Sequence, residues 1–303
     1  MNDKKYIAQL IQKRNQYRRK KLFDEADQIR SLLKEKGVLL EDTTQGTLLK
    51  QLEKKKHVTK KNAFLLLFGS GEISSVGRSI HEFIFKQIGH NINVAIISTP
   101  AGFQPNVKVV HEEIAEFFRN KLRNYVSNVH IIYANTHKDA DNPQLIKFID
   151  EADYIFLGPG SPSYAVTILK DTLLFKKLLR LAQKKKVTIG LSSAGVVAFS
   201  SLCLPVYEIY KVGNPLHWLP GLNFFSTLYK ELTVIPHYNN KEGGPKLDTS
   251  FCYIGEVRFN TMLKLIKNKH IVWGIDENTC IIVDLKNKSL TIKGKGNKHS
   301  IDY

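Results

Sequence analysis

The residues best suited to do chemistry in this 303-residue chain each follow a short apolar run. The serine pair Ser192 and Ser193 follows the apolar run that begins at Val187. His237 follows the run 232–235, and the acid pair Asp276 and Glu277 follows the run 271–275. A serine hydroxyl becomes a strong nucleophile only when a histidine accepts its proton, and the histidine needs a carboxylate to fix its tautomer. Together these residue types indicate covalent catalysis by a serine.

Alternating apolar strands and helical stretches are expected to position these residues. Strands are predicted at 63–68, 94–98, 129–133, 154–157 and 187–189, with helices at 77–87, 107–124, 143–149 and 165–186. This alternation predicts a doubly wound α/β domain whose mostly parallel sheet is covered on both faces and carries the site at its carboxyl strand ends. We expect strands 232–235 and 271–275 to join the same sheet. A hairpin of 280–285 and 289–292 and a basic tail follow.

The loops at the predicted strand ends also contain small residues that could bind a developing oxyanion. Gly158 and Gly160 would let backbone N–H groups approach it, and the N–H of Ala194 would join them. The full set of candidate oxyanion and substrate residues is Gly158, Gly160, Ser161, Ser192, Ala194, Tyr238 and Asn239.

Which of the two serines is the nucleophile depends on the steric demands of a strand-turn-helix elbow. Such an elbow crowds the positions two before and two after the serine, so both are usually Gly or Ala. Ser192 has Gly190 and Ala194 at those positions, whereas Ser193 has Leu191 and Gly195. Sterics therefore favour Ser192. A relaxed, inactive elbow at Ser193 is the alternative that Leu191 raises, and with it a non-catalytic protein.

Three segments resemble peptidase family S51, the dipeptidase E and cyanophycinase group of the class I glutamine amidotransferase-like, flavodoxin-like fold. They are Ser193-Ala194-Gly195, Pro236-His237-Tyr238 and 274–279. The resemblance implies Ser193 as nucleophile, His237 as general base and Glu277 as its orienting acid, and we place the site on Ser193 for this reason. It implies a serine hydrolase that cleaves a peptide or amide bond in a small substrate, without a cofactor or metal. No cysteine occupies the elbow, which disfavours glutaminase chemistry.

The first fifth of the chain is strongly basic, and its sequence pattern predicts a separate helical module. The whole chain carries 45 Lys and Arg against 28 Asp and Glu, and residues 1–62 alone hold 17 against 8. Helices are predicted over 3–21 and 24–36, followed by a short strand from Val38 that enters a polar turn. The basic excess favours a polyanionic partner such as RNA. The candidate nucleic-acid residues are Arg14, Arg18, Arg19, Lys20, Lys21, Arg30 and Asp42.

Residues 23–47 are similar to the C-terminal segment of cysteinyl-tRNA synthetases. The motif is Phe23-x-x-Ala26-Asp27-x-Ile29-Arg30, followed by Gly37-Val38-x-Leu40-Glu41-Asp42-Thr43 and Gly46-Thr47. This resemblance implies tRNA recognition by residues 1–62. Because the chain lacks H-I-G-H and K-M-S-K-S motifs, ligase activity is not expected. Two alternatives remain open: a hairpin that only packs or forms homo-oligomers, and a non-catalytic RNA-associated protein that retains the fold.

The distribution of lysine, apolar residues and cysteine along the chain indicates the domain boundaries and the cellular compartment. We expect a helical module at 1–49, a lysine-rich linker at 50–62 and the α/β domain at 63–303. No run of about 18 apolar residues is present, so no membrane partner is expected. The amino terminus lacks an apolar signal segment, and Cys203, Cys252 and Cys280 are odd in number and widely spaced. These features predict a cytoplasmic protein.

Overall fold

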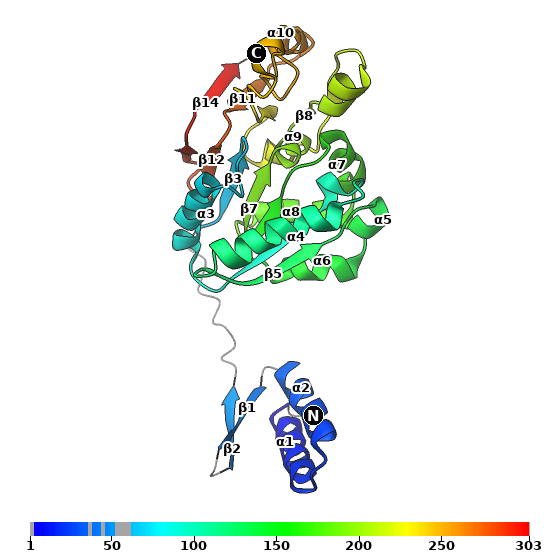
Figure 1. Cartoon of the computed structure of the whole chain (residues 1–303), viewed down its shortest axis with the longest axis vertical. Helices are drawn as coiled ribbons and strands as arrows, with labels where there is room; N and C mark the ends of the chain where they lie inside the picture. Colours follow the sequence, from blue (N-terminus) through cyan, green and yellow to red (C-terminus); the bar gives the residue numbers. More distant parts are fainter. Residues whose placement is uncertain (1–2, 36–37, 44–45, 52–61, 303) are drawn as a thin grey trace. The chain divides into compact units, whose positions relative to one another are not determined.

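The computed structural model describes residues 3–35, 38–43, 46–51 and 62–302 (Figure 1). For residues 3–5, 34–35, 38–39, 41–43 and 46–51 the description covers the backbone only. The chain divides into two compact units, Met1–Thr59 and Lys60–Tyr303.

The N-terminal unit is a helical hairpin followed by a β-hairpin. Its elements are α1 (Asp3–Arg19), α2 (Phe23–Glu35), β1 (Val38–Thr43) and β2 (Gly46–Gln51). Leu33 and Leu40 are buried, and apolar residues of both helices pack against them. Strand β2 pairs with β1 in antiparallel register, so the predicted linker is wrong for its first residues. The rest of that segment, 52–61, lies outside the described residues.

The second unit is built on a seven-stranded sheet in the order β13-β12-β3-β7-β6-β4-β5. Strands β3, β7, β6, β4 and β5 are parallel, and β12 and β13 form an antiparallel edge. Their bounds are β3 (Phe64–Phe68), β4 (Ile92–Ile97), β5 (Val126–Ile132), β6 (Tyr154–Leu157), β7 (Thr188–Ser192), β12 (Thr279–Asp284) and β13 (Leu290–Gly294). The prediction of a mostly parallel α/β sheet is confirmed.

Side-chain alternation along the central strands produces two cores, one on each face of this sheet. In β3, Leu65 and Leu67 belong to one core, whereas Phe64, Leu66 and Phe68 belong to the other. Both faces of the strand are buried, which explains why it reads as a continuous apolar run. The sheet is therefore covered on both sides, as the sequence predicted.

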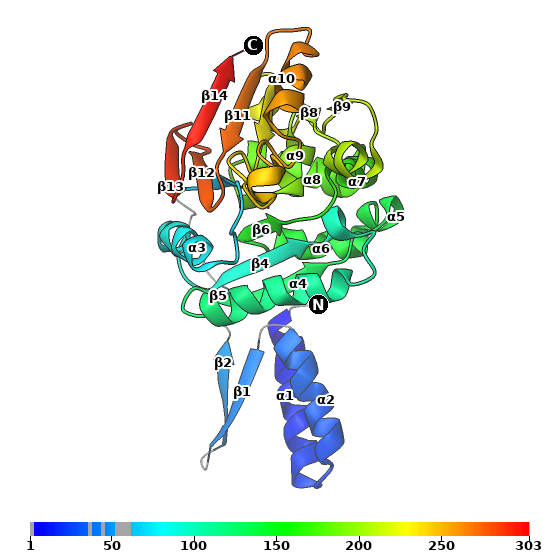
Figure 2. The ribbon, with the colours of Figure 1, turned by 45° about the horizontal axis from the view of Figure 1, so that its top comes forward.

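Helices cover the two faces. The first face carries α5 (His137–Ala140), α6 (Pro143–Asp150), α7 (Pro162–Leu169), α8 (Leu173–Gln183) and α9 (Ala194–Phe199), and the second carries α3 (Ser75–Ile88) and α4 (Val107–Glu116). Figure 2 shows α4 running along β4 and β5. The helix expected at 107–124 changes at Phe117 into a π-helical turn, η2 (Phe117–Lys121). The helix expected at 165–186 is divided into α7 and α8, and Thr172 caps α8.

A separate three-stranded sheet corrects one of our expectations. Strand β11 (Ile271–Ile275) is the middle strand: it pairs in parallel with β10 (Leu232–Ile235) and in antiparallel register with β14 (Lys298–Asp302). Strands β10 and β11 therefore belong to this sheet and not to the large one. The predicted basic tail is thus an ordered strand, which lies beside β11 in Figure 1. Helix α10 (Glu256–Lys264) packs on this second sheet through Phe259 and Met262.

Shorter elements complete the second unit. They are η1 (Thr99–Ala101), β8 (Leu202–Cys203), η3 (Glu208–Val212), β9 (Leu219–Pro220), η4 (Phe224–Thr227) and η5 (Gly244–Lys246). Strands β8 and β9 pair in antiparallel register. Among the helices that the structure describes, none is long and apolar enough to cross a membrane.

Candidate active site

Ser193 occupies a tight turn between β7 and α9. Its backbone has φ 49° and ψ −115°, a conformation that costs an L-residue on the order of 1–3 kcal/mol. The turn is crowded on the helix side, because a Cβ at Gly195 would lie 2.9 Å from the carbonyl oxygen of Leu157. Ser193 thus has the strained strand-turn-helix geometry of a nucleophile elbow.

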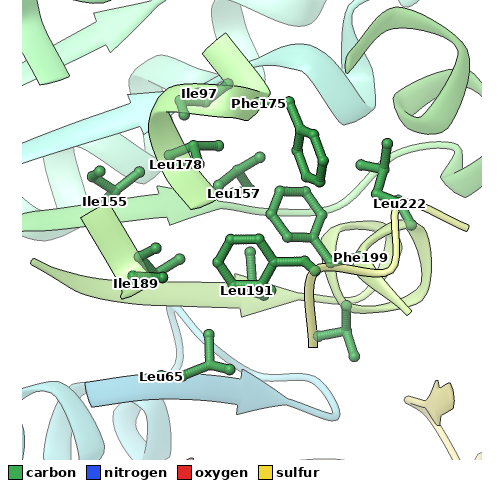
Figure 3. Close-up of a cluster of buried hydrophobic side chains, with 14 of the residues drawn as sticks. Leu65, Ile97, Ile155, Leu157, Phe175, Leu178, Ile189, Leu191, Phe199 and Leu222 are labelled. Carbon is green, nitrogen blue, oxygen red and sulfur yellow. The ribbon is translucent and has the colours of Figure 1, made fainter. Parts of the chain in front are cut away.

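Leu191 does not relax this elbow. Its side chain is fully buried in the core between the sheet and the helices, beside Leu157 and Phe199 in Figure 3. Gly190 is required for a different reason, since a Cβ there would lie 2.0 Å from the Tyr154 hydroxyl. The buried Leu191 side chain and the strained Ser193 backbone therefore argue against the alternative of a relaxed elbow.

The two serines differ in what their hydroxyls contact. Ser193 Oγ lies 3.0 Å from Nε2 of His237. Ser192 is fully buried, and its Oγ has no hydrogen-bond partner within the described part of the chain. The geometry therefore brings Ser193, and not Ser192, to the histidine.

His237 follows β10 and has a left-handed backbone, with φ 52°. Its backbone N–H donates to the carbonyl of Gly69 at the end of β3, over 3.1 Å. This bond joins the second sheet to the large one. Gly69 was not among the candidates from sequence, although it must be glycine: a Cβ there would lie 2.1 Å from the carbonyl oxygen of Asp276.

Glu277, in the turn between β11 and β12, holds the other side of the imidazole. His237 Nδ1 lies 3.1 Å from Glu277 Oε1. The hydrogen bond from His237 lowers the pKa of this carboxyl below its ordinary value, partial burial opposes that effect, and a hydrogen bond from Asn240 adds to it. The carboxylate is therefore ionised at neutral pH and can stabilise a charged imidazole.

Two consecutive asparagines orient Glu277. Asn239 Oδ1 accepts the backbone N–H of Glu277 at 2.8 Å, and the buried Asn240 donates its Nδ2 to Glu277 Oε1 at 2.6 Å. Asn239 was predicted to contact substrate, but the structure uses its side chain to position the acid. Asn240 was missed. The only sequence signal for it is the run Pro-His-Tyr-Asn-Asn after a strand.

Asp276, the other acid of the pair, contacts β14 and the residue that leads into it. Its carboxylate accepts from His299 Nε2 at 2.9 Å and from the Asn297 N–H, which ties β14 to the end of β11. Tyr238 stacks on the same His299 with ring centroids 4.4 Å apart. Tyr238 was a candidate substrate residue, yet the structure places it in this packing cluster and not in the pocket wall.

Ser193 and His237 open into a pocket of about 610 Å³. Of the predicted oxyanion residues, Gly160 and Ala194 line it. Gly158 instead accepts the Gly195 N–H through its carbonyl. Ser161 is buried and caps α7, and its Oγ hydrogen-bonds to Ser163, whose hydroxyl donates to Glu208.

Further polar or aromatic residues of the pocket wall were not predicted from sequence. They include Tyr207, Tyr210, Lys211, Glu242, Thr249 and Tyr253. They come from η3 and the residue before it, and from the irregular segment between β10 and α10, where no periodic pattern marks them. Glu242 accepts the Tyr253 hydroxyl at 2.9 Å. The described residues include no group of three His, Cys, Asp or Glu side chains arranged to hold a metal ion.

The candidate nucleic-acid residues of the N-terminal unit fall into three situations. Arg18, Arg19, Lys20 and Lys21 are exposed at the end of α1, and the exposed Arg30 donates to the Leu40 carbonyl. Arg14 is only 1% exposed, so it does not offer its guanidinium to a phosphate in this conformation. Asp42 lies in β1, and its side chain is outside the description.

The fold and the site together define an α/β protein with a Ser–His–Glu hydrogen-bonded chain beside a strained elbow. The sequence model of Peptidase family S51 matches residues 65–291, and the chain belongs to this family. The second unit is also similar to the crystal structure of a peptidase from an acI-B1 Actinobacterium, at 19% identity and a TM-score of 0.58. That match covers 79% of this chain and 97% of the other, and it shows a shared fold. The family resemblance read from sequence is confirmed.

The N-terminal unit is similar to a different class of protein. It is 61% identical over 41 residues to the cysteine–tRNA ligase of Ligilactobacillus salivarius, and 51% identical over 51 residues to that of Limosilactobacillus reuteri. These matches cover 14% and 17% of this chain. The chain spans only 9% and 11% of the length of these ligases. The resemblance of this segment is thus confirmed as a local one.

Proposed function

We propose that the protein is a serine peptidase in which Ser193 attacks the carbonyl carbon of a peptide or amide bond. The observation that carries this proposal is the 3.0 Å separation of Ser193 Oγ and His237 Nε2, with Glu277 on the far side of the imidazole. In the neutral histidine, Nδ1–H donates to Glu277 and Nε2 accepts the serine proton. This is the proton path that serine nucleophiles require.

The reaction then proceeds in two halves. As the Oγ–C bond forms, His237 takes the serine proton and its positive charge is balanced by the Glu277 carboxylate. The tetrahedral intermediate collapses when the C–N bond breaks and His237 protonates the leaving amine, which leaves an ester on Ser193. A water molecule, activated by the same histidine, hydrolyses that ester.

The backbone N–H of Ala194 is our candidate for oxyanion stabilisation, together with the backbone at Gly160. Ala194 is the first residue of α9, where N–H groups have no acceptor within the helix. Gly160 has φ 148°, and a Cβ there would lie 2.0 Å from the Pro100 carbonyl oxygen. Only glycine therefore lets the chain pass this point of the pocket wall.

The proposal is tested by incubating purified protein with a mixed library of short peptides and following the products by mass spectrometry. Wild-type protein should release new amino termini, and Ser193→Ala should release none. Ser192→Ala is the matched control and should retain cleavage. Equal cleavage by wild type and Ser193→Ala would contradict the proposal, and a complete lack of cleavage by wild type would favour the non-catalytic alternative.

The N-terminal unit supports a second proposal, that it binds tRNA. Its local similarity to cysteine–tRNA ligases and the exposed cluster Arg18, Arg19, Lys20 and Lys21 favour this partner. Anisotropy titrations of labelled tRNA should give an affinity that falls with salt, because phosphate contacts release counterions. Arg19→Ala/Lys20→Ala should weaken binding at low salt about tenfold and reduce the salt slope by about 1–2.

Lys184→Ala/Lys186→Ala, two exposed lysines of the second unit, is the charge-matched control and should bind tRNA like wild type. Equal affinity of the Arg19/Lys20 variant and wild type would contradict tRNA binding by this cluster. A lower sedimentation coefficient of that variant, with tRNA affinity unchanged, would instead support the alternative of a homo-oligomer held by the hairpin.

We also propose a cytoplasmic location. The three cysteines are buried free thiols, which suits a reducing compartment. Fractionation of cells that express the full chain should place it with cytosolic markers, and recovery with a membrane or secreted fraction would contradict the proposal.

A further inference from the structure

A turn of three consecutive left-handed residues lies against the catalytic histidine. Phe251, Cys252 and Tyr253 have φ values of 55°, 59° and 69°. Residues with a Cβ rarely adopt this conformation even singly, and each one is energetically unfavourable. Three in succession persist only when the surrounding structure holds them.

The contacts of this turn hold both itself and His237. The Phe251 N–H donates to the Tyr238 carbonyl at 3.0 Å, and the Cys252 N–H donates to the His237 carbonyl at 3.3 Å. The Tyr253 N–H closes the turn on the Thr249 carbonyl at 3.0 Å. Phe251 packs on Phe259 of α10 with ring centroids 4.6 Å apart. The strained turn is therefore anchored to the same residues that carry the histidine.

These contacts of the turn place the Tyr253 ring beside His237. Its centroid lies 5.4 Å from that of the His237 imidazole, with the two planes tilted by 53°. The Tyr253 hydroxyl donates to Glu242 Oε2 at 2.9 Å, which fixes the ring at its far end. Burial and this bond raise the pKa of the phenol, so it stays protonated and keeps donating across the neutral range.

We propose that Tyr253 is a positioning residue for His237: its ring keeps the imidazole aimed at Ser193 and favours the imidazolium form that catalysis transiently creates. An aromatic face within about 6 Å of a cation attracts it electrostatically. A ring packed against the imidazole also limits its rotation. The role rests on the proposed serine mechanism, and the hydroxyl serves the ring's placement only.

The other charged or titratable groups around His237 are few, which makes the effect of the ring separable. Glu277 contacts the imidazole directly, while Glu242, Lys211, Tyr207 and Tyr210 line the pocket that it faces. Cys252 is adjacent, but burial raises the pKa of its thiol to about 12, so it stays neutral. None of these groups is altered by a substitution at Tyr253, apart from the loss of the hydroxyl bond to Glu242.

Two variants separate the ring from the hydroxyl. Tyr253→Phe and Tyr253→Leu both remove the hydrogen bond to Glu242, but only Tyr253→Leu removes the aromatic face. The measurement is the second-order rate of labelling by a fluorophosphonate probe as a function of pH, which needs no knowledge of the substrate. The rate falls on the acid side as His237 becomes protonated and can no longer accept the serine proton.

We expect Tyr253→Phe to stay within about twofold of wild type with the same acid limb. Tyr253→Leu should lower the plateau rate about two- to fivefold and move the acid limb to lower pH by a few tenths of a unit, because the imidazolium is then less favoured. If leucine prevents folding, Tyr253→Met replaces it and should give the same shift. The proposal would be overturned if Tyr253→Phe and Tyr253→Leu had the same dependence of labelling rate on pH. It would also be overturned if Tyr253→Leu lowered the plateau rate without moving the acid limb of that dependence. Absence of labelling in wild type would instead overturn the serine mechanism itself.

Discussion

The backbone N–H of His237 donates to the carbonyl of Gly69, so the base of the proposed triad is tied to the end of the central strand β3. His237 itself follows β10 of the smaller sheet. Ser193 follows β7, the direct neighbour of β3 in the large sheet. The serine and the histidine thus come from different sheets, and the bond between His237 and Gly69 links the two sheets beside the site.

Gly69→Ala is expected to disturb this junction. The new Cβ would lie 2.1 Å from the Asp276 carbonyl oxygen, and relief of that clash must move either β3 or the turn that carries Glu277. We predict a loss of about 1–3 kcal/mol in the free energy of unfolding, measured in urea, and at least a tenfold slower fluorophosphonate labelling.

The control for this prediction is Gly89→Ala, at the end of α3. Its φ of 112° strains an alanine, but nothing lies within 4 Å of the new Cβ. It should lose a comparable stability through backbone strain while the folded protein labels at the wild-type rate. If Gly69→Ala also labelled at the wild-type rate, the junction would not set the site geometry.

Glu277→Gln should lower reactivity strongly with little change in shape. The amide can donate to Nδ1 and so stabilise the tautomer whose Nε2 carries the proton, which cannot accept from Ser193. Loss of the orienting acid in this way costs up to about 10⁴-fold in rate. Single-turnover labelling at pH 7 checks this, and a loss of less than about tenfold would contradict the role of Glu277.

The carboxyl of Glu277 also predicts a pH dependence of stability. Because its pKa is lower in the folded protein than its ordinary value of 4.5, ionised Glu277 stabilises the fold above that pH. The contribution is lost as the pH falls through the lower folded value. Urea unfolding should therefore find Glu277→Gln less stable than wild type at pH 7, with the difference shrinking towards pH 3. A difference that grows on acidification would contradict the direction of the shift.

Asn240→Ala tests whether the buried amide orients Glu277. A hydrogen bond to a charged group contributes about 1.5–3 kcal/mol, so we predict about a tenfold or greater loss in labelling rate. Asn240→Asp should be worse, since it places a second carboxyl against Glu277. Rates within twofold of wild type for Asn240→Ala would show that the His237 contact alone is enough.

Asp276→Asn distinguishes the two acids that the sequence left open. Asp276 is buried and bonded to His299 and to the Asn297 N–H, so its loss should reduce the free energy of unfolding by about 1–3 kcal/mol. The labelling rate of the folded protein should change less than about threefold. A rate loss as large as that of Glu277→Gln would make Asp276 part of the catalytic machinery.

Local sequence patterns were sufficient to predict the central strands and the turn that carries the serine. Apolar runs placed β3, β6 and β7 correctly, because both faces of these strands are buried. The small residues after β7 marked the elbow. Distance along the sequence from the serine does not reveal strand parity: Leu191 shares its face of β7 with Ile189, in the core beneath the helices.

Features set by long-range pairing could not be read in this way. Strand β14 contains few apolar residues and is stabilised by its pairing with β11. Local sequence periodicity therefore does not identify it as a strand. Strands β10 and β11 likewise lie in this smaller sheet and not in the large one. Asn240 and Tyr253 gain their roles from contacts with Glu277 and His237, which lie 37 and 16 positions away in the sequence.

The most direct test of the account is the site of fluorophosphonate modification. Wild-type protein, Ser192→Ala and Ser193→Ala are labelled side by side, and the modified residue is located by peptide mass mapping. We predict one adduct, on Ser193, in wild type and Ser192→Ala, and none in Ser193→Ala. An adduct on Ser192, or equal labelling of Ser193→Ala and wild type, would contradict Ser193 as the nucleophile.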